Sequence, residues 1–323
     1  MLKKIGLYTF LFVFWPTLSN AGQYYKIYTS LNEALKNPED VQALILKNQH
    51  DLTTIPPEIK NLKNLYIFSV QDCGLTDLPA ELAQLQNLFN LEVVKCKLTK
   101  FPSVVSLCTN IKRLDLSGNN IEIIPPEIAN LQRLEYLNLN ENKIFNLPKQ
   151  IEKVTALRAF YLNHNNLRVL PSEIGSLINL VDLGLSYNEI NGLPDEIGNL
   201  RNLSQLNLTG NKIKRLSDTI GNLESLEYLL LDSNEIEVIP DSIAKLSKLK
   251  RLRLSFNAIK EFPYSVCQIP ELKDMTLLKN PCCMDLTGVI SGCSKEYFKS
   301  MSEDGTRKET LHYFDKKGAR GEN

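Results

Sequence analysis

A 23-residue period runs through most of this 323-residue chain and restricts its fold more than any other feature. Leucine recurs at positions 4 and 6 of the unit in most repeats, asparagine at position 9 and proline at position 15. The units follow one another without slippage and begin at Leu65, Leu88, Ile111, Leu134, Leu157, Leu180, Leu203, Leu226, Leu249 and Leu272. A fixed period of this length predicts a solenoid, in which each unit is one coil that buries its apolar side against its neighbours.

The unit that begins at Leu134 shows how each coil is expected to fold. Leu137 and Leu139 alternate with polar residues, so a strand here turns both leucines inward and the residues between them outward. Pro148 then opens the outer segment, because the first residue of a helical turn does not need its amide hydrogen. Ser217 is the one departure from this proline. The sequence therefore predicts an α/β solenoid, a horseshoe with a parallel β-sheet on its concave face and short helical or 3-10 turns on its convex face.

Asparagine at position 9 marks the bend after each predicted strand. A buried carboxamide there donates to and accepts from backbone groups of the turn and of the neighbouring coil. These residues are Asn119, Asn142, Asn165, Asn188, Asn211, Asn234, Asn257 and Asn280. Cys73 and Cys96 take the same position in two successive units and are interpreted as buried thiols, because parallel side chains rarely reach disulfide geometry. Cys108, at position 21, is interpreted as a core residue.

Residues 1–21 indicate a secretory signal peptide. Lys3 and Lys4 precede an uncharged run that ends at Trp15, and Ser19 and Ala21 supply the small residues of a cleavage region. A membrane anchor is the alternative, but the run is shorter than the roughly 20 apolar residues that cross a bilayer. We expect an extracytoplasmic mature chain without a transmembrane segment; the periplasm, the cell surface and release from the cell all remain open.

Residues 22–40 are expected to form an N-terminal cap, since an open solenoid end exposes apolar surface. Ser30 and Glu33 have the spacing of a capping box at the start of a short helix, and Pro38 is expected to end it. The repeats then span residues 41–281, with ten full units and a partial eleventh.

Residues 282–323 are expected to form a cysteine-bearing cap and a polar tail. In a chain that is expected to be exported, four cysteines near this end favour disulfides over a zinc site. Since neighbours in sequence would pair under strain, Cys267 is expected to pair with Cys282 or Cys283, and Cys293 with the other. The tail from Ser294 loses the period and is expected to lack regular structure.

The inventory of charged and catalytic residues argues against several functions. Lysine plus arginine number 37, as do aspartate plus glutamate, so the basic excess typical of nucleic-acid binding is missing. His50, His164 and His312 lie far apart in the chain, and His164 has no partner at metal-ligand or triad spacing. No glycine-rich phosphate loop follows a predicted strand. We therefore expect no enzymatic activity, no cofactor, no metal and no nucleic-acid partner.

The segments 111–133 (IKRLDLSGNNIEIIPPEIANLQR) and 180–202 (LVDLGLSYNEINGLPDEIGNLRN) resemble the leucine-rich repeat family, in its 23-residue class with LPxEIxxL on the outer side. Residues 30–46 are similar to the first segment of exported bacterial members, which implies a bacterial cell envelope. The resemblance covers roughly residues 30–281. It implies that the protein binds another macromolecule along its concave sheet. Fold alone does not identify the partner.

Positions 3, 5, 7 and 8 of each unit are expected to form the concave surface and to be free of packing. Tyrosine and arginine among short amides are typical of binding hot spots. The candidate partner-binding residues are Tyr136, Asn138, Tyr161, Asn163, His164, Asp182, Tyr187, Asn207, Tyr228, Asp232, Arg251, Arg253 and Phe256. Two hypotheses follow: an adhesin-like or receptor-like protein that binds a protein or a glycan, and a structural envelope scaffold or spacer with no dedicated ligand. The sequence leaves the oligomeric state open.

Overall fold

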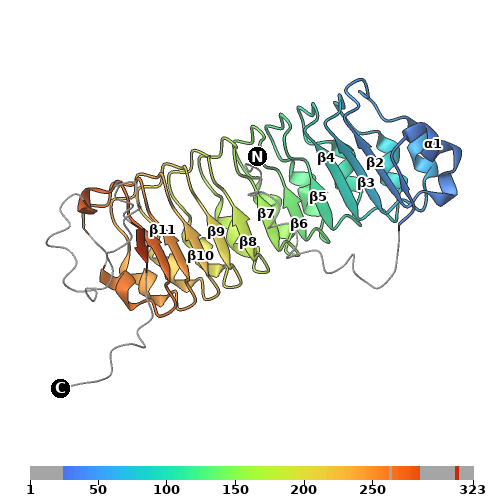
Figure 1. Ribbon diagram of the computed structural model, residues 1–323. Helices are drawn as coiled ribbons and strands as arrows, with labels where there is room; N and C mark the ends of the chain where they lie inside the picture. The colour runs from blue at the N-terminus through green and yellow to red at the C-terminus, as the bar shows by residue number, and fades with distance from the viewer. Residues whose placement is uncertain (1–24, 262–263, 284–309, 313–323) are drawn as a thin grey trace, which may run out of the picture.

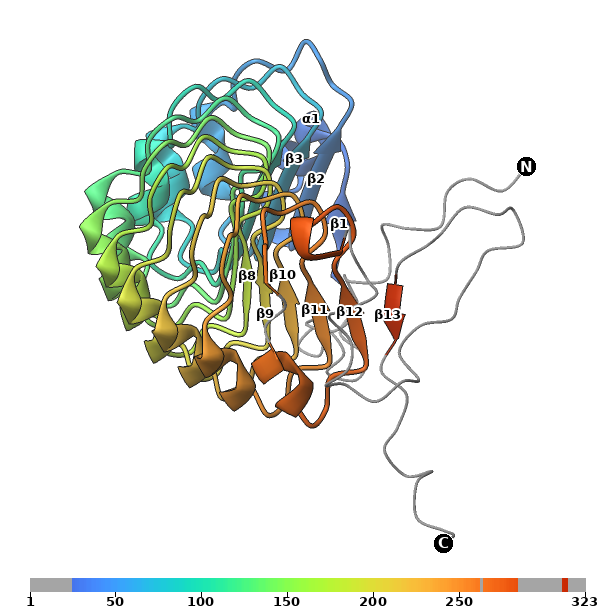
Figure 2. The same ribbon diagram turned by 90° about the vertical axis from the view of Figure 1, so that its left-hand side faces the viewer.

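The computed structural model describes residues 25–261, 264–283 and 310–312, and shows one elongated solenoid (Figure 1). Within these residues the strands form one thirteen-stranded sheet whose spatial order follows the sequence order. Neighbouring strands from β1 to β12 are parallel. Between β4 and β12 the paired residues are 23 positions apart in sequence, as Leu137 and Phe160 are. Seen along the axis, the sheet lines one side and short turns line the other (Figure 2). The predicted solenoid is confirmed.

The strands of the solenoid are short. They are β1 (Ile27–Tyr28), β2 (Ala43–Lys47), β3 (Ile67–Gln71), β4 (Asn90–Val94), β5 (Arg113–Asp115), β6 (Tyr136–Asn138), β7 (Ala159–Tyr161), β8 (Asp182–Gly184), β9 (Gln205–Asn207), β10 (Tyr228–Leu230), β11 (Arg251–Arg253), β12 (Asp274–Thr276) and β13 (Thr310–His312).

One α-helix, α1 (Leu31–Lys36), lies in the described part of the chain, and the other helical segments are 3-10 turns. They are η1 (Pro38–Asp40), η2 (Pro57–Asn61), η3 (Ala80–Gln84), η4 (Ser103–Leu107), η5 (Pro126–Asn130), η6 (Lys149–Lys153), η7 (Ser172–Ser176), η8 (Asp195–Asn199), η9 (Asp218–Asn222), η10 (Asp241–Lys245), η11 (Tyr264–Gln268) and η12 (Pro281–Cys283).

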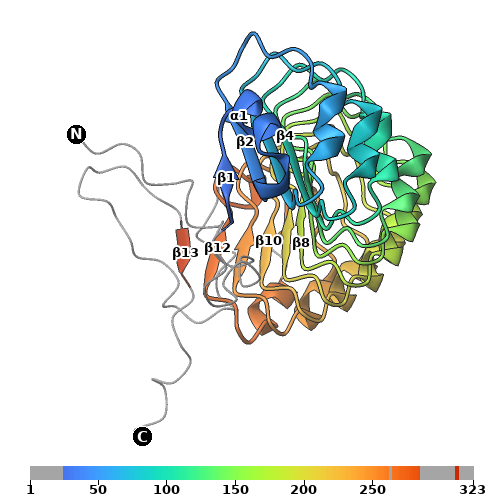
Figure 3. The same cartoon turned by 90° about the vertical axis from the view of Figure 1, so that its right-hand side faces the viewer.

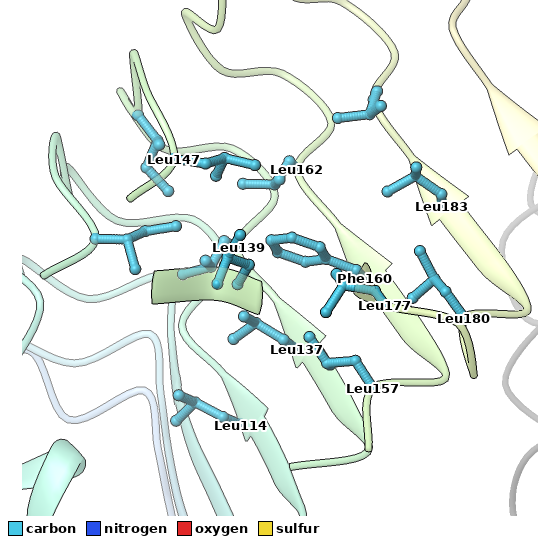
Figure 4. Close-up of a cluster of buried hydrophobic side chains, with 14 of the residues drawn as sticks. Leu114, Leu137, Leu139, Leu147, Leu157, Phe160, Leu162, Leu177, Leu180 and Leu183 are labelled. Carbon is cyan, nitrogen blue, oxygen red and sulfur yellow. The ribbon is translucent and has the colours of Figure 1, made fainter. Parts of the chain in front are cut away.

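The core is a continuous stack of aliphatic side chains between the sheet and the 3-10 turns. Leu137 and Leu139 are fully buried, as the alternation in the sequence predicted. Leu114, Leu137, Phe160 and Leu183 occupy the same position of successive coils and lie side by side (Figure 4). Each coil therefore depends on its two neighbours for the burial of its apolar side.

The asparagine ladder forms as predicted. Nδ2 of Asn165 donates to the carbonyl oxygens of Leu139 (2.9 Å) and Leu162 (3.1 Å), and Oδ1 accepts from the backbone N–H of Ile144 (2.9 Å). One side chain thus satisfies backbone groups of its own bend and of the preceding coils. Cys73 and Cys96 are buried and unpaired, as expected, and burial raises the pKa of Cys96 to about 11.

A second asparagine ladder was missed by the sequence reasoning. At position 23 of four units the side-chain amide donates to a carbonyl of the preceding coil, as Asn202 does to Ile178 at 2.8 Å. The others are Asn87, Asn110 and Asn179, and Asn64 at the end of the first coil donates in the same way to Glu39 of η1. The signal was present, since asparagine recurs there, but these residues are partly or fully exposed and were not interpreted.

The prediction for proline was wrong by one residue. Pro148 is the N-cap of η6, not its first residue, and has φ −70° and ψ 147°. Because the ring fixes φ near this value, proline suits the extended residue that leads into the turn. Ser217 replaces it in η9, and there Oγ accepts from the backbone N–H of Thr219 at 3.2 Å.

The N-terminal cap is present. The hydroxyl of Ser30 accepts from the backbone N–H of Glu33, and Ala34 of α1 is fully buried. Figure 3 shows α1 beside β2, at the end of the solenoid. The predicted signal peptide, residues 1–21, lies outside the described residues and stays a prediction. No helix among the described residues is long and apolar enough to cross a membrane.

The C-terminal end differs from the expectation of an irregular tail. Thr310–His312 forms β13, which pairs antiparallel with β12. The physical reason is that a last strand leaves a row of backbone groups that need partners. The rest of the tail and Cys293 lie outside the described residues, so the predicted cysteine pairing stays a prediction.

Candidate functional site

The predicted partner-binding residues lie on the concave sheet and along its rim. On the strands, with side chains facing away from the core, are Tyr136, Asn138, Tyr161, Asp182, Asn207, Tyr228, Arg251 and Arg253. Asn163 and Asp232 lie just after the strands, at position 7 of their units. The next position, 8, holds His164, Tyr187 and Phe256.

The centre of the sheet carries a group that we call the tyrosine band, namely Tyr136, Tyr161 and Asp182. The two rings meet edge to face at 5.6 Å, and the hydroxyl of Tyr161 donates to Oδ2 of Asp182 at 2.7 Å. The ring of Tyr161 lies over Gly184, where a Cβ atom would come within 2.9 Å of it. Burial raises the pKa of Tyr161, so its hydroxyl stays a donor. The band is fixed before any partner arrives.

Arg113 extends this packing toward β4. Its guanidinium lies 3.5 Å from the centroid of the Tyr136 ring, within cation–π range. Its Nε also lies 3.7 Å from Oε1 of Glu92, and Oε2 of Glu92 accepts from Ser69 (3.0 Å) and Gln71 (3.2 Å). Arg113 on β5 therefore lies between the Tyr136 ring and the oppositely charged Glu92 on β4.

Asp115 is a buried carboxylate on β5. Oδ1 accepts from the backbone N–H (3.0 Å) and hydroxyl (2.6 Å) of Ser117, and Oδ2 accepts from Nδ2 of Asn138 (2.9 Å). Burial raises the pKa of Asp115 despite these donors. Asn138 is thus hydrogen-bonded to a residue of the neighbouring strand.

The amides of the next two coils are linked in the same way. Oδ1 of Asn140 accepts from the backbone N–H (2.7 Å) and Nδ2 (2.9 Å) of Asn163. Oδ1 of Asn163 accepts from the backbone N–H and hydroxyl of Ser186, each at 2.8 Å. The expectation that concave residues are free of packing is therefore wrong here, because polar groups on a half-buried sheet satisfy one another.

The other end of the sheet carries a group that we call the arginine end, namely Tyr228, Arg251, Arg253 and Asp274. Nε of Arg251 and Nη2 of Arg253 both lie 2.8 Å from Oδ2 of Asp274. The guanidinium of Arg251 lies 5.8 Å from the centroid of the Tyr228 ring. Asp232 is held separately, accepting from the backbone N–H of Ser255 at 2.7 Å. The structure thus brings together residues that the sequence could place only in separate repeats.

The rim is formed by position 8, where every residue from the first to the last coil has a positive φ. Only glycine adopts this conformation readily, and bulky side chains do so under strain. Yet Tyr187 (φ 54°) and Phe256 (φ 59°) stand here, each 54 % exposed. The rings of His164 and Tyr187 stack at 4.5 Å, and Tyr187 covers Gly210 on its other side. Folding does not require these aromatic residues.

Four residues of this surface were missed by the sequence reasoning: Glu92, Arg113, Asp115 and Asp274. They occupy the same two positions of the unit, 3 and 5, as the residues that were chosen. Reading those positions through every repeat would have found them. Among the described residues, no group of three or more histidine, cysteine or acidic side chains could hold a metal ion.

The comparisons with known proteins agree with this geometry. Models of a leucine-rich repeat region and of the leucine-rich repeat match residues 168–280 and 109–167. The search of curated proteins found no match.

Several solved structures are similar. A leucine-rich repeat protein of Leptospira interrogans is 34 % identical, with a TM-score of 0.71, and the match covers 80 % of this chain and 71 % of that one. The ectodomain of a plant membrane receptor kinase of Arabidopsis thaliana, solved in complex with Casparian strip integrity factor 2, is 26 % identical, with a TM-score of 0.62; the match covers 75 % of this chain but only 33 % of that one.

An internalin of Listeria monocytogenes shares the fold, with 24 % identity, a TM-score of 0.62 and coverage of 76 % of each chain. Taken together, the repeat, the ladder and the Leptospira structure show that this chain belongs to the leucine-rich repeat family and resembles its bacterial members.

Proposed function

We propose that this protein is exported, has no enzymatic activity, and binds a protein partner through its concave sheet, in the manner of an adhesin or a receptor. The observation that carries the proposal is the rim, where Tyr187 and Phe256 are exposed in a backbone conformation that disfavours them. Large exposed aromatic residues are enriched at protein interfaces, since they contribute contact area at little entropic cost.

Export is supported by the signal-peptide pattern of residues 1–21 and by the disulfide of one cysteine. Cys267 is disulfide-bonded, and disulfides persist in oxidising compartments outside the cytoplasm. The plant ectodomain, solved in complex with Casparian strip integrity factor 2, gives a precedent for ligand recognition on this fold. An envelope or cell-surface location follows from the same proposal.

A scaffold without a ligand is the second candidate, and one observation favours it. The tyrosine band and the amides of Asn138 and Asn163 are already satisfied by neighbours, as the surface of a passive spacer would be. A glycan ligand would use the same concave sheet. The exposed rings of Tyr187 and Phe256 at the rim and the exposed guanidinium of Arg251 favour a binding protein over a spacer.

A pull-down with the full-length chain tests the proposal. The protein is incubated with envelope and extracellular extracts of the producing cells and of the cells they contact. A variant with Tyr187→Ala, Tyr228→Ala and Phe256→Ala is run beside it, and a variant with Ile123→Ala, Val169→Ala and Val238→Ala serves as the matched control. The control removes three exposed apolar residues from outside the concave sheet.

A protein retained by the wild type and the control, but lost by the concave variant, supports the proposal. Retention of the same proteins by all three refutes concave-face binding and favours the scaffold. Circular dichroism and thermal unfolding of each variant show that the fold is kept.

A further inference from the structure

Arg251 and Arg253 lie side by side on β11 and share one counter-ion. Both are 2.8 Å from Oδ2 of Asp274, on β12. The carboxylate of Asp274 is thus shared between two guanidinium groups. Asp232 is the other nearby carboxylate. Burial raises its pKa, and the positive charge of Arg253 opposes this rise, so Asp232 interacts with Arg253. Among the described residues, Arg251 therefore has only the shared carboxylate of Asp274 as a counter-ion.

Arg251 is held in place and still keeps free donors. Its side chain is 46 % exposed, compared with 29 % for Arg253 and 18 % for Asp274. Its Nε is used by Asp274, and the Tyr228 ring lies beside the guanidinium. In the part of the chain that the structure describes, its two Nη groups have no partner. A guanidinium fork fixed in this way matches the two oxygens of a carboxylate.

Aromatic and aliphatic side chains lie beside Arg251 on the β10 side and at the rim. Tyr228 pairs with it on β10, and Leu230 pairs with Arg253 two residues later. Phe256 stands at the rim of the same coil and is exposed. A carboxylate that binds here is therefore flanked by surface that suits the apolar side chains of a peptide. Partial removal of water by such side chains strengthens the ion pair.

We propose that Arg251 is the anchor for a carboxylate side chain of the protein partner, an aspartate or glutamate with apolar residues beside it, and that Asp274 and Arg253 position it. This inference rests on the proposed function and names the chemistry of the partner. It assigns recognition to the arginine end and not to the tyrosine band.

The charges around Arg251 argue for an acidic protein segment over a polyanion. Lys250 is paired with Glu227 at 2.8 Å, and Glu271 also interacts with it. Asp232 faces the same surface. A sulfated glycan or a nucleic acid needs several unmatched cations in a row. A single carboxylate needs only the exposed Nη donors of one arginine, which Arg251 offers.

Selection of dodecapeptides from a random phage library on the full-length protein tests the inference. Selection on the wild type is expected to enrich peptides with an aspartate or glutamate next to apolar residues. The strongest peptide is then synthesised with a fluorescent label, and its affinity is measured by anisotropy. Arg251→Gln is expected to lower the affinity about tenfold or more, since it removes a charge-assisted, two-point contact.

A cycle of substitutions makes the assignment specific. Replacing the acidic residue of the peptide by its amide is expected to cause the same loss with the wild type, and no further loss with Arg251→Gln. Asp274→Asn weakens the contact that positions Arg251 and is expected to lower the affinity several-fold. Arg201→Gln is the matched control, because Arg201 is an exposed arginine paired with Glu224 at 3.2 Å outside the strands of the sheet. It is expected to leave the affinity unchanged.

The outcomes separate the inference from the function on which it rests. Enrichment of peptides without acidic residues, whose binding is lost in the Tyr187, Tyr228 and Phe256 variant, overturns the inference and keeps the function. Binding of a heparin oligosaccharide through Arg251 in the absence of acidic peptides overturns it in favour of a glycan. Absence of any enriched peptide counts against concave-face binding itself and removes the inference with it.

Discussion

The tyrosine band and the arginine end occupy the same face of the same sheet, yet their side chains are in different states. In the tyrosine band, Tyr161 is hydrogen-bonded to Asp182 and packed on Tyr136, and all three are half-buried. At the arginine end, Arg251 is exposed and uses only part of its hydrogen-bonding capacity. The comparison shows that the type of residue does not by itself mark a binding site. What matters is whether neighbours already satisfy the residue.

The physical cause of this difference is the stacking of coils. Residues at one position of successive repeats lie about 4.8 Å apart, so each side chain meets the same position of the next coil. Where the neighbours are complementary, as at Tyr161 and Asp182, they pair. Where two cations are adjacent, as at Arg251 and Arg253, they share the carboxylate of Asp274, and part of their hydrogen-bonding capacity stays free.

The largest expected effect tests whether the two regions share one core. Leu183→Ala beneath the tyrosine band and Leu252→Ala beneath the arginine end each remove a fully buried side chain at position 4. Each is expected to lower the free energy of unfolding by about 2–5 kcal/mol, since each leaves a cavity in the shared stack. Urea unfolding followed by circular dichroism measures both. A loss under about 1 kcal/mol for Leu252→Ala alone would mean that the arginine end is not packed like the centre.

A smaller effect is expected from the hydrogen bond inside the tyrosine band. Tyr161→Phe removes the donor to Asp182, and the half-buried carboxylate loses its partner. We expect the free energy of unfolding to fall by about 1–2 kcal/mol. Tyr187→Phe is the matched control, because its exposed hydroxyl has no hydrogen bond to the described residues. Equal stability of the two variants would contradict the distinction between the band and the rim.

The pH dependence of stability is expected to reveal the buried carboxylate of Asp115. Burial raises its pKa above the ordinary 3.8 in the folded protein. The folded state therefore binds its proton more tightly than the unfolded chain does. This contribution to stability is fully present below the ordinary pKa and is lost as pH rises through the folded-state value.

Asp115→Asn lacks this titration and gives the measurement. We expect the unfolding free energy of the wild type minus that of the variant to fall as pH rises from about 3.5 to about 7. The difference cancels the titration of other groups. A difference that stays constant, or that grows with pH, would contradict the raised pKa.

The smallest effect on stability is expected at the arginine end. Arg251→Gln removes an exposed ion pair, and such pairs contribute about 0–1 kcal/mol. We expect the thermal midpoint to stay close to that of the wild type, although the affinity for an acidic peptide falls. A large loss of stability would show that Arg251 supports the fold, and would weaken its assignment to a partner.

Much of the fold could be predicted from the sequence, because the repeated apolar positions show which side of each coil packs against its neighbours. The alternation of Leu137 and Leu139 predicted the strands, and Asn142 predicted the ladder. The capping box at Ser30 predicted α1. The position of Pro148 was predicted one residue too late in the turn, because it depends on local backbone angles. The strand β13 was missed, because it pairs with a sheet edge that exists only after the coils stack.

The candidate surface could be predicted only as a set of positions. The sequence by itself determined which residues face away from the core, because the period of two along a strand fixes the side of every residue. The sequence did not determine which of these residues keep hydrogen-bonding groups that no neighbour uses. Only the tertiary structure decided that Tyr161 is engaged by Asp182 and that Arg251 keeps free donors, because these states depend on contacts between residues about one repeat apart in sequence and adjacent in space.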